Sequence, residues 1–332
     1  MTANTAALLI QHYVDNFRRL PWRAAPGEPA PEPYRVWLSE VMLQQTTVAT
    51  VRPRFERFVE RWPTIEALAA ARHEDVLSEW AGLGYYARAR NLIACARAVA
   101  ERGGFPSTSV ELRQLPGIGA YTAAAIAAIA FGERAPAVDT NVQRVIARLH
   151  RLRHAPREII EPLLLDMLPA ARPGDLIQAM MDLGATICRP RSPSCQECPL
   201  RSECAAFASG APAQFPAPKV KRVRPHRHAA AYWTEWNGQV WLVRRPAKGL
   251  LGGMAALPTS EMTETPPRNL NSIGVVRHVF THFSLDLHII VASETVGDGW
   301  WQPVAGIDEA GLPTLFRRAA ELVMSASERR AA

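Results

Sequence analysis

The sequence predicts a chain of two domains, an all-α domain followed by an α+β domain. In residues 34–204, apolar residues recur three and four positions apart between short breaks marked by Pro or Gly, which is typical of packed helices. Beyond residue 228 the pattern changes to short runs rich in β-branched and aromatic residues. A chain of 332 residues is long enough for two separate cores. We therefore place the two domains at residues 1–204 and 229–332.

The composition excludes several classes of protein. Hydrophobic residues make up 48% of the chain and charged residues 21%, as in ordinary globular proteins. No apolar run approaches the roughly 20 residues of a membrane helix. The N-terminal stretch MTANTAALLIQHYVDNFRR carries its charge after the apolar run and has no cleavage signature, unlike a secretory signal. We expect a cytoplasmic protein.

A basic segment, residues 205–228, joins the two domains. It contains four prolines, five basic residues and no acidic residue, and it shows no periodicity. Much of the chain's net charge of +7 lies there. This composition predicts an extended, solvated linker, and the same charge would also suit a phosphate backbone.

The second domain shows three local signals of an α+β fold. Asn237-Gly238 separates two β-rich runs, which is the strongest short signal for a hairpin. A final helix is expected over residues 314–326. Alternating apolar residues predict a strand with one buried face. The residues of that face are Phe283, Leu285, Leu287, Ile289 and Val291.

Four cysteines lie close together near the end of the first domain. Six, two and five residues separate Cys188, Cys195, Cys198 and Cys204. In a cytoplasmic chain such a group indicates metal ligation rather than disulfides. Four thiolates suit a zinc ion or a 4Fe-4S cluster, and the spacing leaves both open. Cys95 falls on an apolar helical face and is expected in the core.

The stretch LPGIGAYTAAAIAAIAF combines a turn with the start of an Ala-rich helix. Gly117 and Gly119 would allow the backbone to turn sharply, so that its amide groups and the helix N-terminus face a phosphate. A G-x-G pair alone is a weak signal, because most such pairs are only turns.

Two carboxylates stand in patterns that suit an acid and an anion. Asp139 precedes the helical run TNVQRVIARL, where it would cap the helix at a gain of about 1 kcal/mol and, held by amide donors, stay ionised. Glu40 lies on one helical face together with apolar residues such as Val36 and Leu43. A carboxyl group there would hold a proton near neutrality, unless an arginine pairs with it or the face is exposed. Cleavage of an N-glycosidic bond requires an acid for the departing base and an anion for the sugar cation.

Several motifs resemble one family of enzymes. The C-x6-C-x2-C-x5-C pattern resembles the iron–sulfur loop of the endonuclease III family of DNA glycosylases, which favours a 4Fe-4S cluster over zinc. LPGIGAYTAAAIAAIAF followed by GERAPAVDTNV resembles the helix-hairpin-helix and aspartate loop of the same superfamily. SEVMLQQT at residues 39–46 and GLGYYARARNL at 82–92 resemble the MutY-type adenine glycosylases more closely than their pyrimidine-specific relatives.

The resemblance implies roles for the catalytic residues. Glu40 would be the acid that protonates adenine N7, Asp139 would stabilise the sugar cation, and Asn141 follows in the same catalytic loop. The family often has Asp-Gly-Asn and a nearby lysine here, whereas this chain has Thr140 and Gln143. We expect that difference to affect trapping with DNA more than turnover.

Tyr121 stands where the related glycosylase/lyases carry the lysine that forms a Schiff base with the sugar. Residues 1–218 contain no lysine that could substitute for it. The resemblance therefore implies hydrolysis of the base without efficient strand cleavage. Tyr121 would hydrogen-bond the aspartate or the sugar, or it would simply pack on Pro116.

The same resemblance implies contacts with DNA. Gln44 and Gln45 match residues that contact bases near the lesion, and Tyr85 matches an aromatic wedge inserted into the duplex. Gly117 and Gly119 would grip the backbone. Flipping a nucleotide out of the stack costs a few kcal/mol, which gives a wedge its physical purpose.

The C-terminal domain resembles the Nudix-like module with which this family reads 8-oxoguanine on the opposite strand. GLLGGMAALP at residues 249–258 resembles one of its elements. Phe280, Thr281 and His282 match a Phe-Ser-His loop, although such a histidine alone is more often a turn residue. The sequence has no Nudix-box array of glutamates, which argues against metal-dependent pyrophosphate hydrolysis.

Together these patterns predict a monomeric, monofunctional adenine glycosylase of the nucleoid. Its expected partner is double-stranded DNA with adenine opposite 8-oxoguanine or guanine, and contacts with replication or repair proteins remain open. The alternatives are a pyrimidine-lesion glycosylase/lyase, a thymine–guanine mismatch glycosylase, a non-catalytic iron–sulfur DNA-binding module and a nucleotide pyrophosphatase. The absent lysine argues against the first of these.

Overall fold

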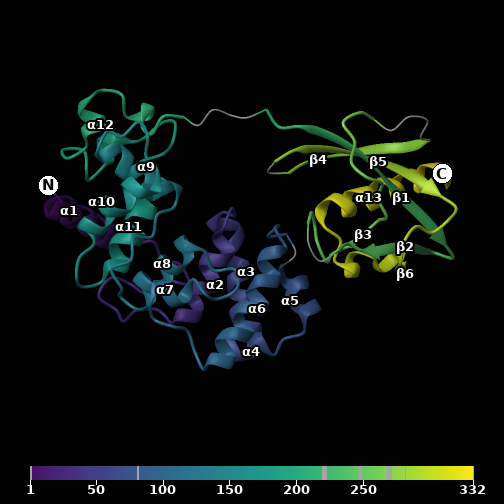
Figure 1. The fold of residues 1–332 in the computed structure, drawn as a ribbon, viewed down its shortest axis with the longest axis horizontal. Coiled ribbons are helices and arrows are strands. Elements are labelled where there is room, and N and C mark those ends of the chain that lie inside the picture. The colour runs from purple at the N-terminus through teal and green to yellow at the C-terminus, as the bar shows by residue number, and fades with distance from the viewer. Residues whose placement is uncertain are drawn as a thin grey trace. The chain divides into compact units, whose positions relative to one another are not determined.

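The computed structural model of the chain consists of two compact units, shown as ribbons in Figure 1. One unit contains Met1–His73 and Arg90–Val220, and the other contains Glu74–Ala89 and Lys221–Ala332. Within these units the structure describes residues 2–80, 82–218, 223–246, 249–266, 271–280 and 282–331.

The first unit is helical, as the apolar periodicity predicts. Its first helix precedes the region in which the sequence predicts helices. The elements of this unit are α1 (Thr2–Asp15), α2 (Pro33–Leu43), α3 (Val48–Arg61), α4 (Ile65–Ala69), α6 (Ala87–Arg102), α7 (Ser109–Leu112), α8 (Ala120–Ala130), α9 (Thr140–Leu149), α10 (Arg157–Met167), α11 (Pro173–Thr186), η1 (Cys195–Glu197), α12 (Ala205–Ala208) and η2 (Pro212–Gln214).

Helix α8 forms the buried centre of the helical unit. Its residues 122–129 are all buried, because the run TAAAIAAI offers no charged face to solvent. The helix packs against α2, α7 and α11. Gly174 allows α11 to approach closely, since a Cβ atom there would lie 2.6 Å from the Cα of Ile129. This packing sets α2 and α11 against α8, and all three helices contribute residues to one cavity.

Residues 205–217 fold against the helical unit instead of forming the extended, solvated linker that the sequence predicts. Ala206 and Phe215 are buried. The carbonyl group of Phe215 accepts a hydrogen bond from Nε of Arg148 at 2.9 Å. The prediction was wrong because it weighed the prolines and charges and overlooked apolar side chains that pack beside α9. Residues 219–222, at the centre of the basic run, lie outside the described part of the chain.

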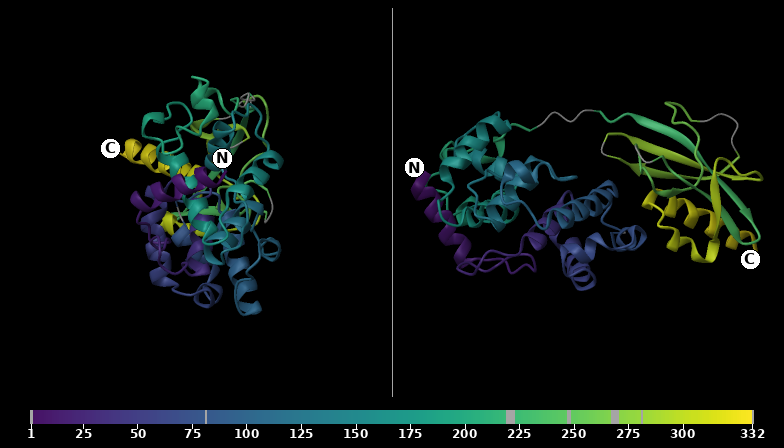
Figure 2. Two further views of the ribbon diagram at one scale, coloured as in Figure 1. Left: turned by 90° about the vertical axis from the view of Figure 1, so that its left-hand side faces the viewer. Right: turned by 60° about the horizontal axis from the view of Figure 1, so that its bottom comes forward.

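In its described residues, the second unit contains a six-stranded mixed sheet. The strands follow the order β3-β2-β1-β5-β4, with β6 paired to β2. Strands β1 and β5 are parallel, and the other pairs are antiparallel. Helix α13 packs on one face of the sheet (Figures 1 and 2). The elements are α5 (His73–Trp80), β1 (His226–Trp236), β2 (Gln239–Arg244), β3 (Ala255–Ala256), β4 (Ser272–Val279), β5 (Ser284–Ala292), β6 (Gly299–Pro303), η3 (Val304–Ala310) and α13 (Thr314–Ala331).

The local predictions for this unit are largely confirmed. Residues 237–238 have φ angles of 50° and 69° and join β1 to β2 as the predicted hairpin. Leu285, Leu287 and Ile289 form the buried face of β5 and pack with α13. Val291 is 55% exposed, because it lies beyond the last β5 residue of that core cluster. The final helix begins where predicted and continues for one more turn.

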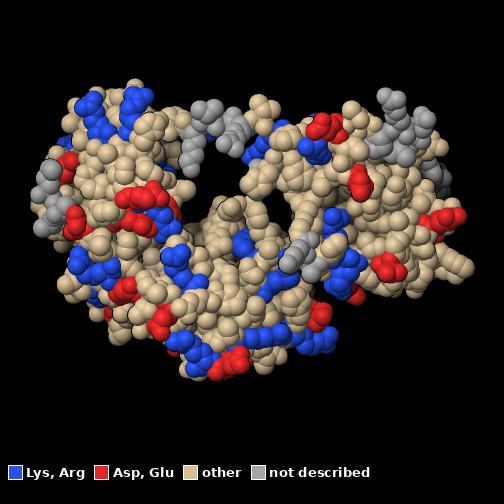
Figure 3. All heavy atoms as spheres, in the orientation of Figure 1, with Lys and Arg blue, Asp and Glu red and all other residues tan. Residues whose placement is uncertain are grey.

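Among the described residues, no helix has both the length and the apolar character needed to cross a membrane. On the face that Figure 3 shows, basic and acidic side chains are interspersed on each unit.

Candidate active site

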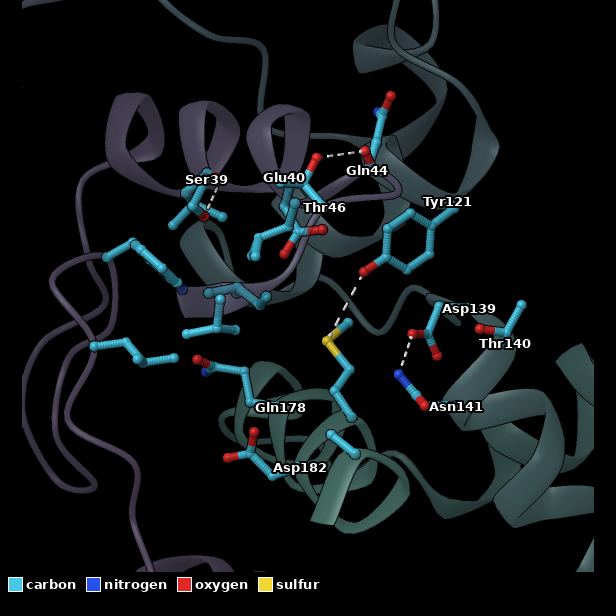
Figure 4. Close-up of a pocket in the computed structure, with 18 of the residues that line it drawn as sticks. Ser39, Glu40, Gln44, Thr46, Tyr121, Asp139, Thr140, Asn141, Gln178 and Asp182 are labelled. Carbon is cyan, nitrogen blue, oxygen red and sulfur yellow. Dashed lines mark hydrogen bonds between the residues drawn. The ribbon is translucent and has the colours of Figure 1, made fainter. Parts of the chain in front are cut away.

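A cavity of about 860 Å³ in the helical unit brings together the residues expected to carry the chemistry. Glu40, Tyr121, Asp139 and Asn141 all line it, and Figure 4 shows them around one space. They come from the last turn of α2, the first turn of α8 and the start of α9. Segments far apart in the sequence therefore meet at one site.

Glu40 is buried, with 8% of its surface exposed. Burial is the main cause of a rise in the pKa of Glu40 to about 7. A hydrogen bond from Tyr121 lowers this pKa, the charge of Asp139 raises it, and the charge of Arg23 lowers it. The predicted rise is confirmed. Arg23 lines the same cavity but pairs with Asp182, with Nη1 2.6 Å from Oδ2. A carboxyl group with this pKa is partly protonated near neutrality and can act as an acid.

Tyr121 lies in the first turn of α8, and its hydroxyl group points into the cavity (Figure 4). The hydroxyl oxygen is 3.8 Å from Sδ of Met181, which is a weak acceptor. Glu40 is the stronger acceptor for the same proton. The hydrogen bond between the two side chains lowers the pKa of Glu40 and raises the pKa of Tyr121. Burial, followed by the charges of Glu40 and Asp139, raises the pKa of Tyr121 well above its usual value. The hydroxyl group therefore stays protonated and acts as a donor.

Asp139 caps helix α9, as the sequence predicts. Its Oδ1 accepts a hydrogen bond from the backbone N–H of Val142 at 2.7 Å. Its Oδ2 accepts a hydrogen bond from Nδ2 of Asn141 at 2.9 Å (Figure 4). Donors thus hold both oxygens, which suits a carboxylate that only accepts hydrogen bonds. The cap fixes this group at the cavity wall.

Arg144 and Arg148 are two arginines of α9 that contact the cysteine segment, and Arg144 also contacts Asn141 beside Asp139. Arg144 donates from Nη2 to Oδ1 of Asn141 at 2.8 Å and from Nε to the carbonyl group of Cys188 at 2.8 Å. Arg148 is 2% exposed and donates from Nη1 to Sγ of Cys188 at 3.2 Å. Neither residue is predicted from the sequence to have this role. Their four-residue spacing, which places them on one helical face, is the only local signal of this role.

The four cysteines predicted to bind a metal line one small cavity of the helical unit. Apolar residues such as Ile187 and Phe207 and the guanidinium groups of Arg148 and Arg201 complete its walls. A donor set of four thiol groups around one space fits either a 4Fe-4S cluster or a zinc ion. The four ligands would be Cys188, Cys195, Cys198 and Cys204. Cys95 is buried in α6, which confirms its predicted place in the core.

The residues predicted to contact bases lie at turns. Gln44 lines the large cavity and donates from Nε2 to Oγ1 of Thr122 at 3.3 Å. Gln45 is exposed and has a φ of 57°, in the left-handed region that few residues other than Gly adopt. Tyr85 is 51% exposed and has a φ of 48°, and the guanidinium group of Arg88 lies 5.5 Å from its ring centroid. Strained turns that expose such side chains are common where a protein meets a ligand.

Only one of the two glycine positions in the predicted phosphate turn requires a glycine. Gly117 has a φ of 73°, and a Cβ atom there would lie 2.5 Å from Cβ of Asn91. Gly119 has a φ of −86° and open space beside it, so its backbone would accept other residues. Gly119 is the N-cap of α8 and offers no side chain to the first amide groups of that helix. Those groups face the turn, as a phosphate contact would require.

The predicted lesion-reading residues lie between β4 and β5. Phe280 packs its ring 4.8 Å from that of Phe283 and 4.5 Å from that of His278. His282 is exposed. Thr281 lies outside the described residues. The predicted position at a junction of two strands is confirmed.

Helix α11 adds a wall to the cavity that the sequence does not predict. Asp182 accepts hydrogen bonds from Arg18 at 2.9 Å and from Arg23 at 2.6 Å. Gln178 is 5% exposed and donates to the carbonyl group of Gly174 at 3.3 Å. The two contacts of Asp182 join positions about 160 residues apart, so no local pattern predicts them.

Comparisons with known proteins agree with this architecture. Residues 38–169 match the family model "HhH-GPD superfamily base excision DNA repair protein", and residues 229–322 match the NUDIX domain model. A thermostable thymine-DNA glycosylase is 26% identical with a TM-score of 0.55, over 61% of this chain and 95% of that chain. A trapped endonuclease III–DNA covalent intermediate is 26% identical with a TM-score of 0.53, over 62% and 95%. The helical unit thus has the fold of the helix-hairpin-helix base excision repair proteins.

Proteins named adenine DNA glycosylase are similar over more of the chain. The one from Mycolicibacterium smegmatis is 43% identical over 64% of this chain and 73% of its own length. The mouse protein is 35% identical over 85% of this chain and 69% of its own length. The chain belongs to the adenine DNA glycosylase family. It spans about half the length of the Arabidopsis thaliana relative, which is 35% identical over 87% of this chain and 53% of its own length.

Proposed function

We propose that this protein hydrolyses the N-glycosidic bond of adenine in double-stranded DNA, where the adenine is mispaired with 8-oxoguanine or guanine. The observation that carries the proposal is the pair of carboxyl groups in one cavity. Glu40 is buried with a pKa near 7, and Asp139 is fixed by two hydrogen-bond donors. Two carboxyl groups in such different environments suit an acid and an anion.

In this mechanism Glu40 donates its proton to N7 of the departing adenine. Neutralising the leaving base lowers the barrier, because adenine is otherwise a poor leaving group. Asp139 then stabilises the positive charge that develops on the sugar. Water then attacks the sugar carbon.

The same residues argue against the lyase route. A Schiff base needs an amine, and position 121 carries a phenol that stays protonated. Tyr121 instead donates a hydrogen bond toward Glu40 and helps to hold the acid in place. The product is an abasic site in an unbroken strand.

The cysteine cavity supports a resident cofactor. We propose that the four cysteines hold a 4Fe-4S cluster, because their pattern resembles the iron–sulfur loop of the endonuclease III family. When bound, such a cluster supplies redox-active iron and a rigid fold for its loop rather than acid–base chemistry. Arg148 donates to Cys188 and would help to compensate the negative charge of the thiolates. Iron and zinc analysis of the purified protein distinguishes a cluster from a zinc ion.

The proposed substrate rests on both units. The strained turns that carry Gln45 and Tyr85 would meet the duplex, and the turn at Gly117 would hold a phosphate. The loop at residues 280–282 would read 8-oxoguanine on the opposite strand. Adenine glycosylase names among the relatives favour adenine over thymine as the excised base.

A panel of duplexes tests the substrate and the acid together. Purified protein is incubated with adenine opposite 8-oxoguanine, adenine opposite guanine, or thymine opposite guanine, and alkali then reveals abasic sites. We expect release of adenine, fastest opposite 8-oxoguanine, and its loss in Glu40→Gln. Glu32→Gln, at the exposed start of the same helix, is the matched control. Cleavage only at thymine would overturn the proposed specificity, and that outcome would agree with the likeness to the thymine-DNA glycosylase.

A further inference from the structure

A cluster of metal-binding side chains lies on the sheet of the second unit, apart from the site described above. His226 and His228 belong to β1, and Asp286 and His288 belong to β5. The two strands are parallel, and their register sets His228 beside Asp286 and Ala230 beside His288. Side chains two positions apart in a strand lie on the same face, so the register gathers all four groups.

This face of the sheet is the one that α13 does not cover. Leu285 and Leu287 of β5 pack with α13, and Asp286 between them lies on the opposite side. Asp286 and His228 are buried, whereas the side chain of His226 is 40% exposed. The cluster therefore borders solvent at His226.

The distances within the cluster match those of a metal site. Nδ1 of His228 lies 3.3 Å from Nε2 of His288, and Nε2 of His226 lies 3.3 Å from Oδ2 of Asp286. The ligand atoms of His226, His228 and Asp286 all lie within 4.8 Å of one another, and His288 lies outside this group of three but contacts it through His228. Bonds of about 2.0–2.2 Å in tetrahedral geometry place ligand atoms about 3.3–3.6 Å apart. Two of the ligand pairs already have this spacing.

A second layer of contacts orients the ligands. Oγ of Ser284 lies 2.7 Å from Nδ1 of His226, which leaves Nε2 directed at Asp286. Arg277 holds Asp286 through Nε to Oδ1 at 2.8 Å and Nη2 to Oδ2 at 2.9 Å. Such contacts are typical of metal ligands. The positive charge of Arg277 opposes a cation, but its side chain is 71% exposed, so solvent screens that charge and the guanidinium group has room to move.

We propose that His226, His228, Asp286 and His288 bind one divalent transition-metal ion. Three imidazoles and one carboxylate suit zinc, and they do not suit calcium or magnesium, which take oxygen ligands. The ion joins the first residues of β1 to those of β5. It thereby stabilises the start of this unit's sheet, at the end of β5 that follows the connection from β4.

Zinc titration of the full-length protein, with its iron content measured, tests the site. A chromogenic chelator competes for the metal, so that the dissociation constant is measured directly. We expect one equivalent bound in the micromolar range or tighter, and binding weakened at least about 100-fold in His228→Ala. His278→Gln is the control, because His278 pairs with Leu285 and lies on the α13 face of the same sheet. The control binds zinc like the wild type.

The position of the ion is checked in crystals soaked with zinc. Anomalous scattering on both sides of the zinc edge separates zinc from iron, and we expect a peak between His228 and His288. His226→Asn alters an exposed residue and keeps the test meaningful if His228→Ala does not fold. Wild-type zinc binding in both His226→Asn and His288→Gln would overturn the proposal, as would zinc located only elsewhere. The readout is independent of glycosylase activity, so the proposed function stands or fails separately.

Discussion

The two walls of the large cavity hold the same chemical group in different ways. At the end of α2, burial dominates the environment of Glu40 and raises its pKa to about 7. At the start of α9, a backbone N–H and an amide side chain each donate to one oxygen of Asp139. The contrast shows that position in the fold sets the environment of each carboxyl group: burial for Glu40 and fixed hydrogen-bond donors for Asp139.

Asp139→Asn separates the catalytic role of this residue from its role as a helix cap. Asparagine caps a helix about as well as aspartate, so the free energy of unfolding should change by less than about 1 kcal/mol. The charge beside the sugar is lost, and we expect single-turnover adenine release to slow by about 100- to 1,000-fold. Asp166→Asn, at an exposed position of α10, is the control. Normal activity in Asp139→Asn would reduce Asp139 to a cap.

Glu40→Gln should stabilise the protein at alkaline pH while it removes activity. The pKa of Glu40 rises from an ordinary 4.5 to about 7 on folding, so its proton favours the folded state at low pH. That contribution is lost as pH rises through about 7, where the buried carboxyl group of Glu40 loses its proton. We expect a gain of at most about 3 kcal/mol at pH 9 and little change at pH 5, measured by denaturant unfolding. An equal effect at both pH values would contradict burial as the cause.

The rate of adenine release should fall with pH in the wild-type enzyme. An acid of pKa about 7 loses its proton above that value, so the single-turnover rate should drop about tenfold per pH unit there. Below pH 6 the rate should level off. A rate that stays constant from pH 6 to pH 9 would show that Glu40 is not the proton donor.

Some features of the site and the fold can be predicted from the sequence, and others cannot. The helical face of Glu40 and the cap at Asp139 are local patterns, and the structure confirms both. The hairpin at residues 237–238 follows from two residues that favour a positive φ. Asp182 and Arg144 act through contacts with distant segments, which a helical pattern does not encode. Packing decided these positions.

Arg144 supports the position of Asp139 indirectly, through Asn141. This side chain donates to Asn141, which donates in turn to Asp139. Arg144→Met keeps much of the aliphatic stem and removes the donors, so Asn141 loses its fixed orientation. We expect adenine release about tenfold slower with little change in DNA affinity, because a second layer of contacts typically contributes about 10- to 100-fold. Arg157→Met, at the start of α10, is a control on the same cavity rim. A loss of affinity with an unchanged rate would place Arg144 in DNA binding instead.

We expect the weakest effect on activity from the hydroxyl group of Tyr121, which interacts with both Glu40 and Asp139. Tyr121 lowers the pKa of Glu40 by hydrogen bonding, in opposition to burial. Tyr121→Phe removes that donor and leaves the ring, so the pKa of Glu40 should rise and the midpoint of the pH–rate profile should move upward by less than about one unit. The variant should therefore be relatively more active at pH 8 than at pH 6, whatever its absolute rate. A downward shift would mean that the hydroxyl group acts mainly on Asp139, and the distinction between the two walls would then rest on burial alone.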